Sequence, residues 1–560
     1  MPSKPKPAAP NEEDRAAYAG RWVALAGGQV VGHGGTPEQA WRSSQAARHK
    51  ESLEVQYMPT SHPFAFSHLL ERVREIAPQD IPVYLVGGAV RDALLGLPTH
   101  DLDFALSGDV LSLARRVADH LDGAYFPLDE ARATGRVILV IQGEQRQVLD
   151  FAALRGSDLE SDLRARDFTI NAMAVALDAP QALLDPTGGA ADLVARRVRV
   201  CSPTSLEDDP LRILRGVRLA AALQLNIDLP TRQLMRQAAP NLTRVSPERV
   251  RDELLRILDG RRPDLAVRAL DLLEVLRVVL PEMAALHGVL QSPPHIHDVW
   301  THTLDLLQRL EQILGILQVE HDPEKVASWA LGMISVRLGR YRTKIQEHFD
   351  QTQLNVDRSL RSILFLAALF HDVAKPQTRQ VDEHSRVRFF EHDALGAELV
   401  AARAHALHLS NPEIDRLRTI VRQHMRPLLL AQTGGQISRR AIYRFFQATG
   451  QAGVEICLLS LADTMATYGP GLPQDVWTRQ LDVVRTLLEA YWEQPEQSVS
   501  PPPLISGHDL INLFHLAPGS QIGSLLQQGR EAQAAGDIQD RQQALAFIRQ
   551  TLDPNLDADR

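Results

Sequence analysis

Two aspartates that flank one apolar residue carry the clearest chemistry in this sequence. Asp101 and Asp103 stand on either side of Leu102, after a short apolar stretch and a turn. Residues two apart on a β-strand point to the same face, so both carboxylates emerge together. The two charges repel, and a divalent cation such as Mg²⁺ between them relieves the repulsion. A single Asp-x-Asp is also common at solvated strand ends, so the pair needs support from its surroundings.

The segment before the pair supplies that support. Residues 83–86, VYLV, are typical of a buried strand, and the strand ends at Gly87 and Gly88. A helix is predicted from 89 to 95, with Arg91 on one side. Glycines before a helix let backbone N–H groups approach phosphate oxygens closely, although Gly-Gly turns without this role are frequent. Together the elements predict a site for a nucleotide and Mg²⁺.

The order of GGAVRD and then DLD resembles the nucleotidyltransferase signature of the class II tRNA CCA-adding enzymes and bacterial poly(A) polymerases. The resemblance implies an α/β head domain of the polymerase-beta-like type. It also implies that metal binding, catalysis and nucleotide binding fall to the residues of these motifs, namely Asp101, Asp103, Gly87, Gly88 and Arg91.

A third carboxylate lies on a later predicted strand, RQVLDFAAL. An acid on the inner face of a half-buried sheet needs a partner, whereas one on the outer face does not, and the pattern alone leaves both positions open for Asp150. The strand resembles the one that carries an acidic residue near the metal site in this family. The resemblance therefore implies a catalytic role for Asp150 beside Asp101 and Asp103.

Residues 162–175, DLRARDFTINAMAV, resemble the arginine motif of the same family. Arg166 and Asp167 match its last two positions, while Ala165 replaces the first arginine. The resemblance implies that Arg166 neutralises triphosphate charge and that Asn171 holds sugar or phosphate oxygens, roles suited to a guanidinium fork and an amide. An ion pair at the start of a strand is the alternative.

Residues 206–223, LEDDPLRILRGVRLAAAL, are predicted to begin a helix with acidic residues and Pro210 in its first turn. A capped amphipathic helix would show the same pattern. The segment resembles the family motif in which an Asp and an Arg read the Watson–Crick edge of the incoming nucleotide, which assigns that role to Asp209 and Arg212. Arg215 continues along the helix toward the phosphates or the RNA.

A second helix, predicted over 244–258 with Ser246 as N-cap and Pro247 at its first position, resembles the neck of these enzymes. The net charge of -9 disfavours bulk attraction to nucleic acid, but this region is locally basic. Its arginines form either a candidate RNA contact or simply a solvated face. They are Arg249, Arg251, Arg256, Arg261 and Arg262.

Histidines concentrate after residue 290, on or beside apolar helical segments. Single histidines there are usually core residues, but a His-Asp pair within an apolar helix suits a divalent metal and hydrolysis of phosphate esters. The order His, His-Asp, His, His, Asp resembles the HD phosphohydrolase superfamily. It implies a second metal such as Mn, Ni, Fe or Co, held by His302, His371, Asp372, His392, His424 and Asp463.

Length and composition predict a multidomain protein. The 560 residues, 44% hydrophobic and 23% charged, include only Cys201 and Cys457, and we expect neither a disulfide framework nor a membrane span. The N-terminal residues lack the apolar core of a signal peptide, so we expect a cytoplasmic protein. The expected parts are a disordered tail at 1–14, a small α+β module at 15–60, the head at 61–200, an all-α neck at 201–285, the HD domain at 286–470 and a helical tail at 471–560.

We therefore expect a template-independent nucleotidyltransferase that adds C and/or A residues to the 3′ end of tRNA. The expected partners are tRNA or another RNA 3′ end, ATP and, where C is added, CTP. The alternatives are a poly(A) polymerase, an HD phosphohydrolase with an RNA-binding head, and a non-enzymatic RNA-binding protein. Asp101, Asp103 and Arg212 count against the last two alternatives, because binding alone does not need paired metal carboxylates.

Overall fold

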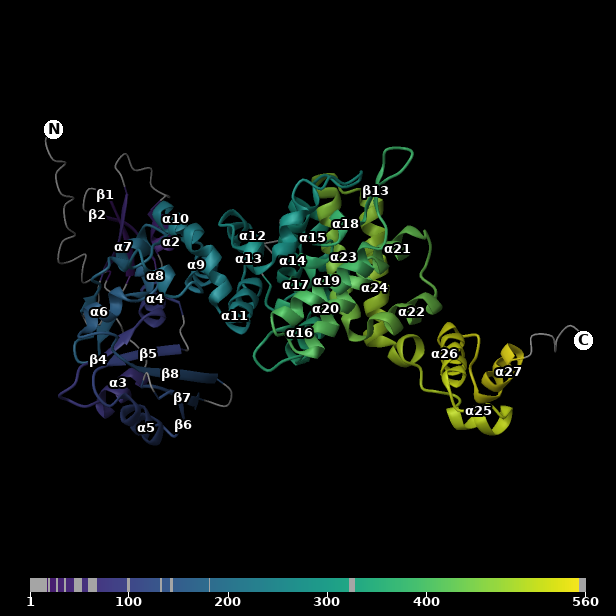
Figure 1. Cartoon of the computed structure of the whole chain (residues 1–560), viewed down its shortest axis with the longest axis horizontal. Helices are drawn as coiled ribbons and strands as arrows, with labels where there is room; N and C mark the ends of the chain where they lie inside the picture. The colour runs from purple at the N-terminus through teal and green to yellow at the C-terminus, as the bar shows by residue number, and fades with distance from the viewer. Residues whose placement is uncertain are drawn as a thin grey trace, which may run out of the picture. The chain divides into compact units, whose positions relative to one another are not determined.

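The computed structural model describes residues 18, 21–26, 29–34, 37–44, 53–58, 68–97, 101–130, 133–141, 145–180, 182–321 and 328–552 (Figure 1). The predicted disordered tail at 1–14 lies outside the described residues. The chain forms two compact units that divide between Asn241 and Leu242, within the segment predicted as the neck. Each unit is described by itself.

The first unit begins with the small α+β module. Strands β1 (Arg21–Ala26), β2 (Gln29–Gly34) and β3 (Glu54–Met58) form an antiparallel sheet in the order β2-β1-β3, and α2 (Pro37–Ser44) packs on β1 and β2. These strands and the helix make the module α+β, as predicted. Trp22 of β1 is buried, and its indole Nε1 donates a hydrogen bond to the carbonyl oxygen of Leu94, which ends a helix of the head.

A seven-stranded mixed sheet, ordered β10-β9-β4-β5-β8-β7-β6, is the frame of the head. The β5 and β8 strands run parallel, and the other neighbours are antiparallel. The strands are β4 (Val83–Val86), β5 (Asp101–Leu106), β6 (Ala124–Asp129), β7 (Thr134–Ile141), β8 (Gln145–Ala153), β9 (Ala174–Ala176) and β10 (Leu183–Leu184).

The two faces of this sheet differ. Alternate residues of the central strands, such as Leu102, Phe104 and Phe151, are buried on one face, where the rings of Phe104 and Phe151 stack at 4.8 Å. Helix α5 (Val110–His120) packs against β6, β7 and β8. It covers the same face, because an added Cβ at Gly135 would meet the Ala114 side chain at 3.1 Å. The other face presents the polar residues of the strands.

Helices and short strands complete the first unit. The predicted helix after β4 is confirmed as α4 (Gly88–Leu94). The remaining elements are α3 (His68–Ile76), α6 (Leu159–Arg164), η1 (Thr169–Asn171), α7 (Gly189–Val194), β11 (Arg197–Val198), α8 (Ser205–Asp208), α9 (Arg212–Leu223), β12 (Asn226–Ile227), α10 (Leu229–Ala238) and, reaching across the division, η2 (Ala239–Arg244).

One helix of this unit differs from its prediction. The segment 206–223 does not form a continuous helix, because Asp209 adopts an extended backbone with φ -144° and ψ 96° between α8 and α9. Pro210 has no backbone N–H, and it follows the break rather than lying inside a helix. Arg212 is thus the first residue of α9.

The second unit is almost entirely helical. The predicted helix at 244–258 is confirmed as α11 (Pro247–Leu258), with Ser246 as N-cap. The helices that build the following core are α12 (Pro263–Leu272), α13 (Leu276–Val279), η3 (Pro281–Leu286), α14 (Val299–Ile316), α15 (Trp329–Leu338), η5 (Gly339–Tyr341), α16 (Arg342–Gln351), α17 (Leu360–Phe370), α18 (Lys375–Thr378), α19 (His392–Ala406), α20 (Asn411–Gln423), α21 (Arg426–Gln432), α22 (Arg439–Thr449), η6 (Gly450–Ala452), α23 (Gly453–Tyr468), η7 (Gly469–Gly471) and α24 (Gln474–Glu493).

A small hairpin and a C-terminal helical group belong to the same unit. The hairpin pairs β13 (Arg379–Val381) with β14 (Val387–Phe389). After a π-helical turn, η8 (Pro495–Val499), the last three helices are α25 (Gly507–Phe514), α26 (Ser520–Ala535) and α27 (Arg541–Leu552), which share a core around Leu510, Leu525 and Ile548. Over the described residues, no helix is both long and apolar enough to cross a membrane.

Candidate nucleotidyltransferase and metal sites

Three acidic residues and one arginine follow the polar face of the head sheet. Asp103 on β5 lies opposite Asp150 on β8, and Asp150 lies opposite Arg136 on β7. Residues in register on neighbouring strands point to the same face, so the three side chains form a row across the sheet. Asp101, two residues before Asp103 on β5, points to that face as well. The structure thus brings all three predicted carboxylates together.

Gly87 lies at one end of this row. Its φ of +77° is in the region that favours glycine, and it is the N-cap of α4. A Cβ added at Gly87 would lie 3.2 Å from Arg166 Nη1 and 3.4 Å from Asp103 Oδ2. The glycine turn, the guanidinium and the carboxylate therefore converge at one point, as the two motifs predicted. Gly88 follows as the first residue of α4.

A chain of polar contacts connects the other predicted nucleotide-binding residues. Arg91 donates to Asn171 Oδ1 at 2.5 Å, and Asn171 Nδ2 donates to Asp167 Oδ1 at 3.2 Å. The second oxygen of Asp167 pairs with Arg215 at 3.3 Å. Arg91 also pairs with Asp92, whose pKa is raised by burial although Arg91 opposes this. The guanidinium of Arg91 thus lies within the protein and holds Asn171.

Arg166 and Arg212 are held by different partners. Arg166 pairs with the buried Asp162 at 2.9 Å, a contact that the sequence motifs did not indicate. Arg212 donates to Ser205 Oγ at 2.7 Å and to the carbonyl oxygen of Ala165 at 3.1 Å. The contact with Ser205 joins the first residue of α9 to the first residue of α8, across the break between the two helices.

The electrostatics of the row favour a bound cation. Burial, with the neighbouring charge of Asp150 in addition, raises the pKa of Asp103 to about 6, although Arg166 acts in the opposite direction. A bound cation stabilises the charged form of a carboxylate whose pKa is raised in this way. The oxygen donors of the row suit Mg²⁺.

The second cluster lies in the helical unit, and the structure brings together all six residues predicted there. They come from five segments: the first turn of α14, the residues after α17, the start of α19, the end of α20 and the middle of α23. Two groups of three have ligand atoms within 4.8 Å of one another, and Asp372 belongs to both: His302, His371 and Asp372, and then Asp372, His392 and His424. Asp463 lies 3.1 Å from His302 Nε2.

Hydrogen bonds orient three of these imidazoles. The Nδ1 atoms of His371, His392 and His424 face backbone carbonyl oxygens at 2.7, 2.8 and 2.7 Å. This places hydrogen on Nδ1 and turns the free Nε2 inward, the arrangement of metal-ligating histidines. Among the described residues, the buried Nε2 atoms of all three have no hydrogen-bond partner. The donor set therefore fits a pair of divalent metal ions that share Asp372.

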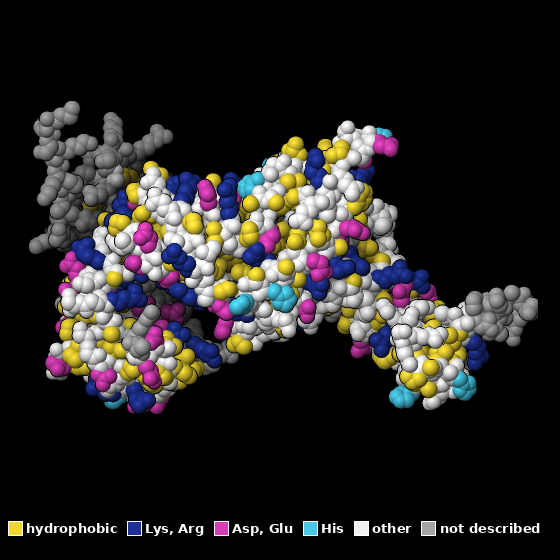
Figure 2. All heavy atoms as spheres, in the orientation of Figure 1, with side chains coloured by type: hydrophobic (Ala, Val, Ile, Leu, Met, Phe, Trp, Pro, Cys, Tyr) yellow, Lys and Arg dark blue, Asp and Glu magenta, His cyan; other side chains and the backbone are white. Residues whose placement is uncertain are grey.

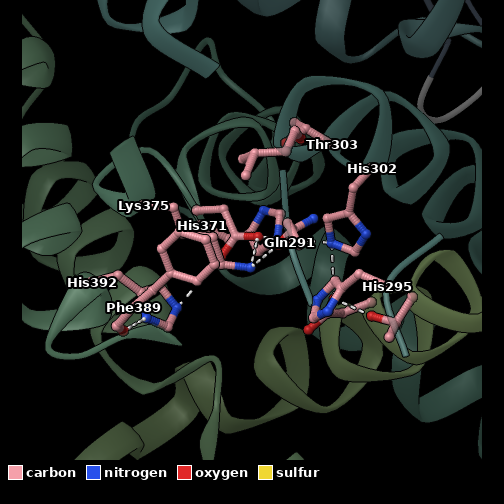
Figure 3. Close-up of polar contacts among 12 residues, drawn as sticks. Gln291, His295, His302, Thr303, His371, Lys375, Phe389 and His392 are labelled. Carbon is pink, nitrogen blue, oxygen red and sulfur yellow. Dashed lines mark hydrogen bonds and ion pairs between the residues drawn. The ribbon is translucent and has the colours of Figure 1, made fainter. Parts of the chain in front are cut away.

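Three residues that are not predicted ligands lie beside the histidine cluster (Figure 3). Lys375 is buried and lies 2.6 Å from Asp372 Oδ2, and it donates to Gln291 Oε1 at 2.7 Å. His295 stacks edge-on against His302 at 5.4 Å between ring centroids. Sequence reasoning missed these three residues. The spacing of Lys375, three residues after Asp372, was the one signal for it.

Charge and burial set the protonation of this cluster. Burial opposes the charge of Asp372, but His371 and Lys375 hold its pKa well below the usual range. Burial and the charges of His371 and His392 lower the pKa of His424 to about 4, and burial with Lys375 lowers that of His295 to about 4. His424 and His295 are thus neutral near neutral pH, and for His424, a predicted ligand, the neutral imidazole is the form that binds metal.

The arginines proposed as an RNA contact are partly engaged within the second unit. Arg251 pairs with Asp252 at 2.8 Å, Arg256 with Glu253 at 3.4 Å, and Arg262 with Asp264 at 2.9 Å. On the face shown in Figure 2, basic and acidic side chains are interspersed. Three of the five arginines thus have an acidic partner close by in the sequence.

Three family models match successive parts of the chain. They are the poly A polymerase head domain over residues 83–199, the probable RNA and SrmB-binding site of polymerase A over 224–286, and the HD domain over 299–467. The first match contains the carboxylate row and the third contains the histidine cluster. Fold and site together define a nucleotidyltransferase head followed by a helical HD domain.

Similar proteins indicate which kind of nucleotidyltransferase family the chain belongs to. The chain is 33% identical to the A-adding tRNA nucleotidyltransferase of Deinococcus radiodurans, over 83% of this chain and 94% of that protein. It is 32% identical to the CC-adding tRNA nucleotidyltransferase of Thermus thermophilus, over 84% and 96%. A solved CCA-adding enzyme in complex with ATP shares the fold, with a TM-score of 0.55 at 22% identity over 87% of this chain and 94% of that one. The chain belongs to the tRNA nucleotidyltransferase family.

Proposed function

We propose that this protein adds C and/or A residues to the 3′ end of tRNA without a nucleic-acid template, with tRNA, ATP and CTP as its substrates. The observation that carries the proposal is the row of in-register carboxylates beside the Gly87 turn and Arg166. Relatives that add A and relatives that add CC are about equally similar to this chain, so both remain in the proposal.

Each group of the head has a role in this proposal. Asp101 and Asp103 hold Mg²⁺, with Asp150 next to them on the same face; when bound, the ions supply charge stabilisation at the transferred phosphate. The backbone at Gly87 and Gly88 approaches the triphosphate, and Arg166, anchored by Asp162, neutralises its charge. Asn171, held by Arg91, contacts sugar or phosphate oxygens.

Base choice falls to the start of α9. Asp209 and Arg212 present an acceptor and a planar donor fork, the two kinds of group that the Watson–Crick edges of cytosine and adenine require. Four contacts to oxygen atoms hold Arg212 on one side, which restricts the direction of its remaining N–H groups. Arg215 lies one turn further along the helix, next to Asp167.

The test offers each labelled triphosphate to three tRNAs that lack CCA, lack only A, or end in CCA. We expect incorporation into at least one of the first two and none into the third. Asp101→Asn and Asp103→Asn should each reduce incorporation at least a hundredfold. Asp119→Asn, which changes an exposed carboxylate on α5 over the opposite face of the sheet, is the matched control and should keep wild-type activity. Incorporation into an RNA without tRNA structure at the same rate would instead indicate a poly(A) polymerase.

The histidine cluster favours a second activity, metal-dependent hydrolysis of phosphate esters. His302, His371, Asp372, His392, His424 and Asp463 would hold the metal, which would supply charge stabilisation and an activated water for this hydrolysis, and Lys375 adds a positive charge at the same place. The metals proposed are Mn, Ni, Fe or Co. Protein stripped with EDTA should regain hydrolysis of a cyclic or terminal phosphate when one of them is added. Failure with all four, and with Mg²⁺, would reduce the cluster to a structural role.

A further inference from the structure

The sheet face that carries the carboxylates becomes apolar toward its far edge. Phe126 on β6 lies opposite Arg136 on β7, so it continues the carboxylate row on the same face. Ile138 and Val140 follow Arg136 at every second position of β7, and they point to that face as well. Phe126, Ile138 and Val140 together form what we call the β6–β7 surface.

The exposure of the β6–β7 surface departs from the usual pattern of a sheet. A sheet with one covered face normally carries apolar residues on that face and polar residues on the other. The covered positions follow this rule, since Val137 and Leu139 are buried on the α5 face. The opposite positions do not, because Phe126 is 47% exposed and Val140 is 68% exposed. Large apolar side chains that cluster on an open face are typical of a site for another molecule.

The position of this surface indicates which molecule it binds. The groups assigned to the triphosphate, Gly87 and Arg166, lie on the β4 side of Asp103. In an in-line transfer, the attacking oxygen and the leaving pyrophosphate are on opposite sides of the transferred phosphorus. The 3′-hydroxyl of the RNA therefore approaches from the other side of Asp103, where β8, β7 and β6 follow in that order (Figure 1). Phe126 lies about 14 Å further along the sheet, so it meets the nucleotides that precede the reacting one.

We infer that the β6–β7 surface binds the unpaired nucleotides at the 3′ end of tRNA, with one base stacked on Phe126. The inference rests on the proposed function. Single-stranded nucleic acids bind to aromatic rings that stack with bases and to positive charges that meet the phosphates. Arg146 on β8 supplies such a charge, because it lies opposite Val140 and is exposed, and among the described residues no acidic side chain pairs with it. A second copy of the chain is the alternative occupant, but it would not explain why the surface continues the carboxylate row.

The test measures the binding of two RNAs by fluorescence anisotropy, without triphosphate. One is a tRNA that lacks only its final A, and the other is the same tRNA trimmed to its last base pair. Phe126→Ala should lose at least fivefold in affinity for the first RNA, the lower end of what stacking of one base contributes, and nothing for the trimmed RNA. Phe126→Tyr should retain the wild-type affinity for both. Trp41→Ala, which removes an exposed aromatic side chain from α2, is the matched control and should change neither value.

A charge variant tests the phosphate contact separately. Arg146→Gln should weaken binding of the untrimmed tRNA and reduce the slope of log Kd against log salt concentration by about 0.7, the value for one phosphate of a single strand.

Three results would overturn the inference. They are equal losses for both RNAs in Phe126→Ala, no loss in that variant with a wild-type circular dichroism spectrum, and a wild-type dimer that Phe126→Ala converts to a monomer, since the surface would then bind a second copy. If binding of the untrimmed tRNA depended on Phe126 but no triphosphate were incorporated into it, the inference would stand and the proposed function would fail.

Discussion

The folded structure disfavours the charged form of the Asp103 carboxyl group. Its pKa of about 6 lies above the usual value of 3.8, chiefly because of burial and because Asp150 adds like charge. An acid whose pKa is raised by folding binds protons more readily in the folded state. The free energy of unfolding therefore falls as pH rises from about 4 to about 6, and above that range the full penalty is present.

We expect Asp103→Asn to stabilise the metal-free head at pH 7.5, by roughly 1 to 3 kcal/mol, since the variant removes this penalty. The gain should shrink at pH 4.5, where much of the wild-type carboxyl is already protonated. Urea unfolding in EDTA at both pH values measures the difference. Adding Mg²⁺ should stabilise the wild type and not the variant. A gain that was the same at both pH values would contradict the assigned pKa.

Gly87 provides a second test at this scale. Its backbone, with φ +77° and ψ -135°, is one that residues with a side chain avoid, at a cost of about 1 to 3 kcal/mol. Gly87→Ala should also displace the Arg166 guanidinium, which would lie 3.2 Å from the new methyl group. We expect KM for the triphosphate to rise at least tenfold. Gly315→Ala, on the exposed side of α14 with no atom nearby, is the control and should leave KM unchanged.

At the scale of elements, the strands that hold the carboxylates were predictable. Apolar alternation marks which face of β5 and β8 is buried, and the acids occupy the other positions, so strand and site follow from one pattern. The register was not predictable: that Asp103, Asp150 and Arg136 form a row depends on strand order, which local sequence does not carry. No local sequence pattern therefore indicated that Arg136 belongs to the row.

The break at Asp209 was missed for a different reason. Helical periodicity continues across 206–223, and Pro210 is acceptable in a first turn, so local signals favour one helix. The tertiary contacts of Arg212 with Ser205 and Ala165 select the broken form. In the second unit the order of histidines and acids predicted the ligand set, but Gln291 and His295 come from an irregular segment without a periodic signal.

The break leads to a prediction about base choice. Ser205→Ala removes the shortest, at 2.7 Å, of the four contacts that hold Arg212, and it leaves the arginine in place. We expect the ratio of kcat/KM for CTP and ATP to move about five- to tenfold toward no preference, while triphosphate affinity changes little, because base contacts set selectivity and phosphate contacts set affinity. Competition assays with both triphosphates measure the ratio.

Thr204→Ala is the control for this experiment. Thr204 is exposed beside Ser205, and its side chain does not cap α8. It should therefore retain wild-type selectivity. If Ser205→Ala weakened both triphosphates equally, Arg212 would act on the phosphates and its assignment to the base edge would be wrong.

At the scale of the whole molecule, the two candidate metal sites belong to different compact units. The carboxylate row lies before Asn241, and the histidine cluster lies after Leu242. Each unit has its own buried core, and each site takes its predicted ligands from one unit alone. Loss of a ligand is local to its ion unless the unit unfolds. The two activities should therefore separate in variants of the full chain.

We expect His371→Ala combined with Asp372→Ala to remove the metal-dependent hydrolysis of cyclic or terminal phosphates and to leave CTP and ATP incorporation within about twofold of wild type. Asp372 is shared by both ligand groups, so its loss should release both ions, and metal analysis should show a decrease of up to two Mn²⁺ per chain in the HD unit.

His405→Ala with Asp415→Ala, which removes an exposed histidine and aspartate from α19 and α20, is the matched control. Circular dichroism and thermal unfolding must show wild-type helical content and cooperativity, since Asp372 and His371 are buried. Equal loss of both activities in a folded double variant would mean that the two units form one catalytic system, because a local metal defect in one cannot otherwise reach the carboxylates of the other.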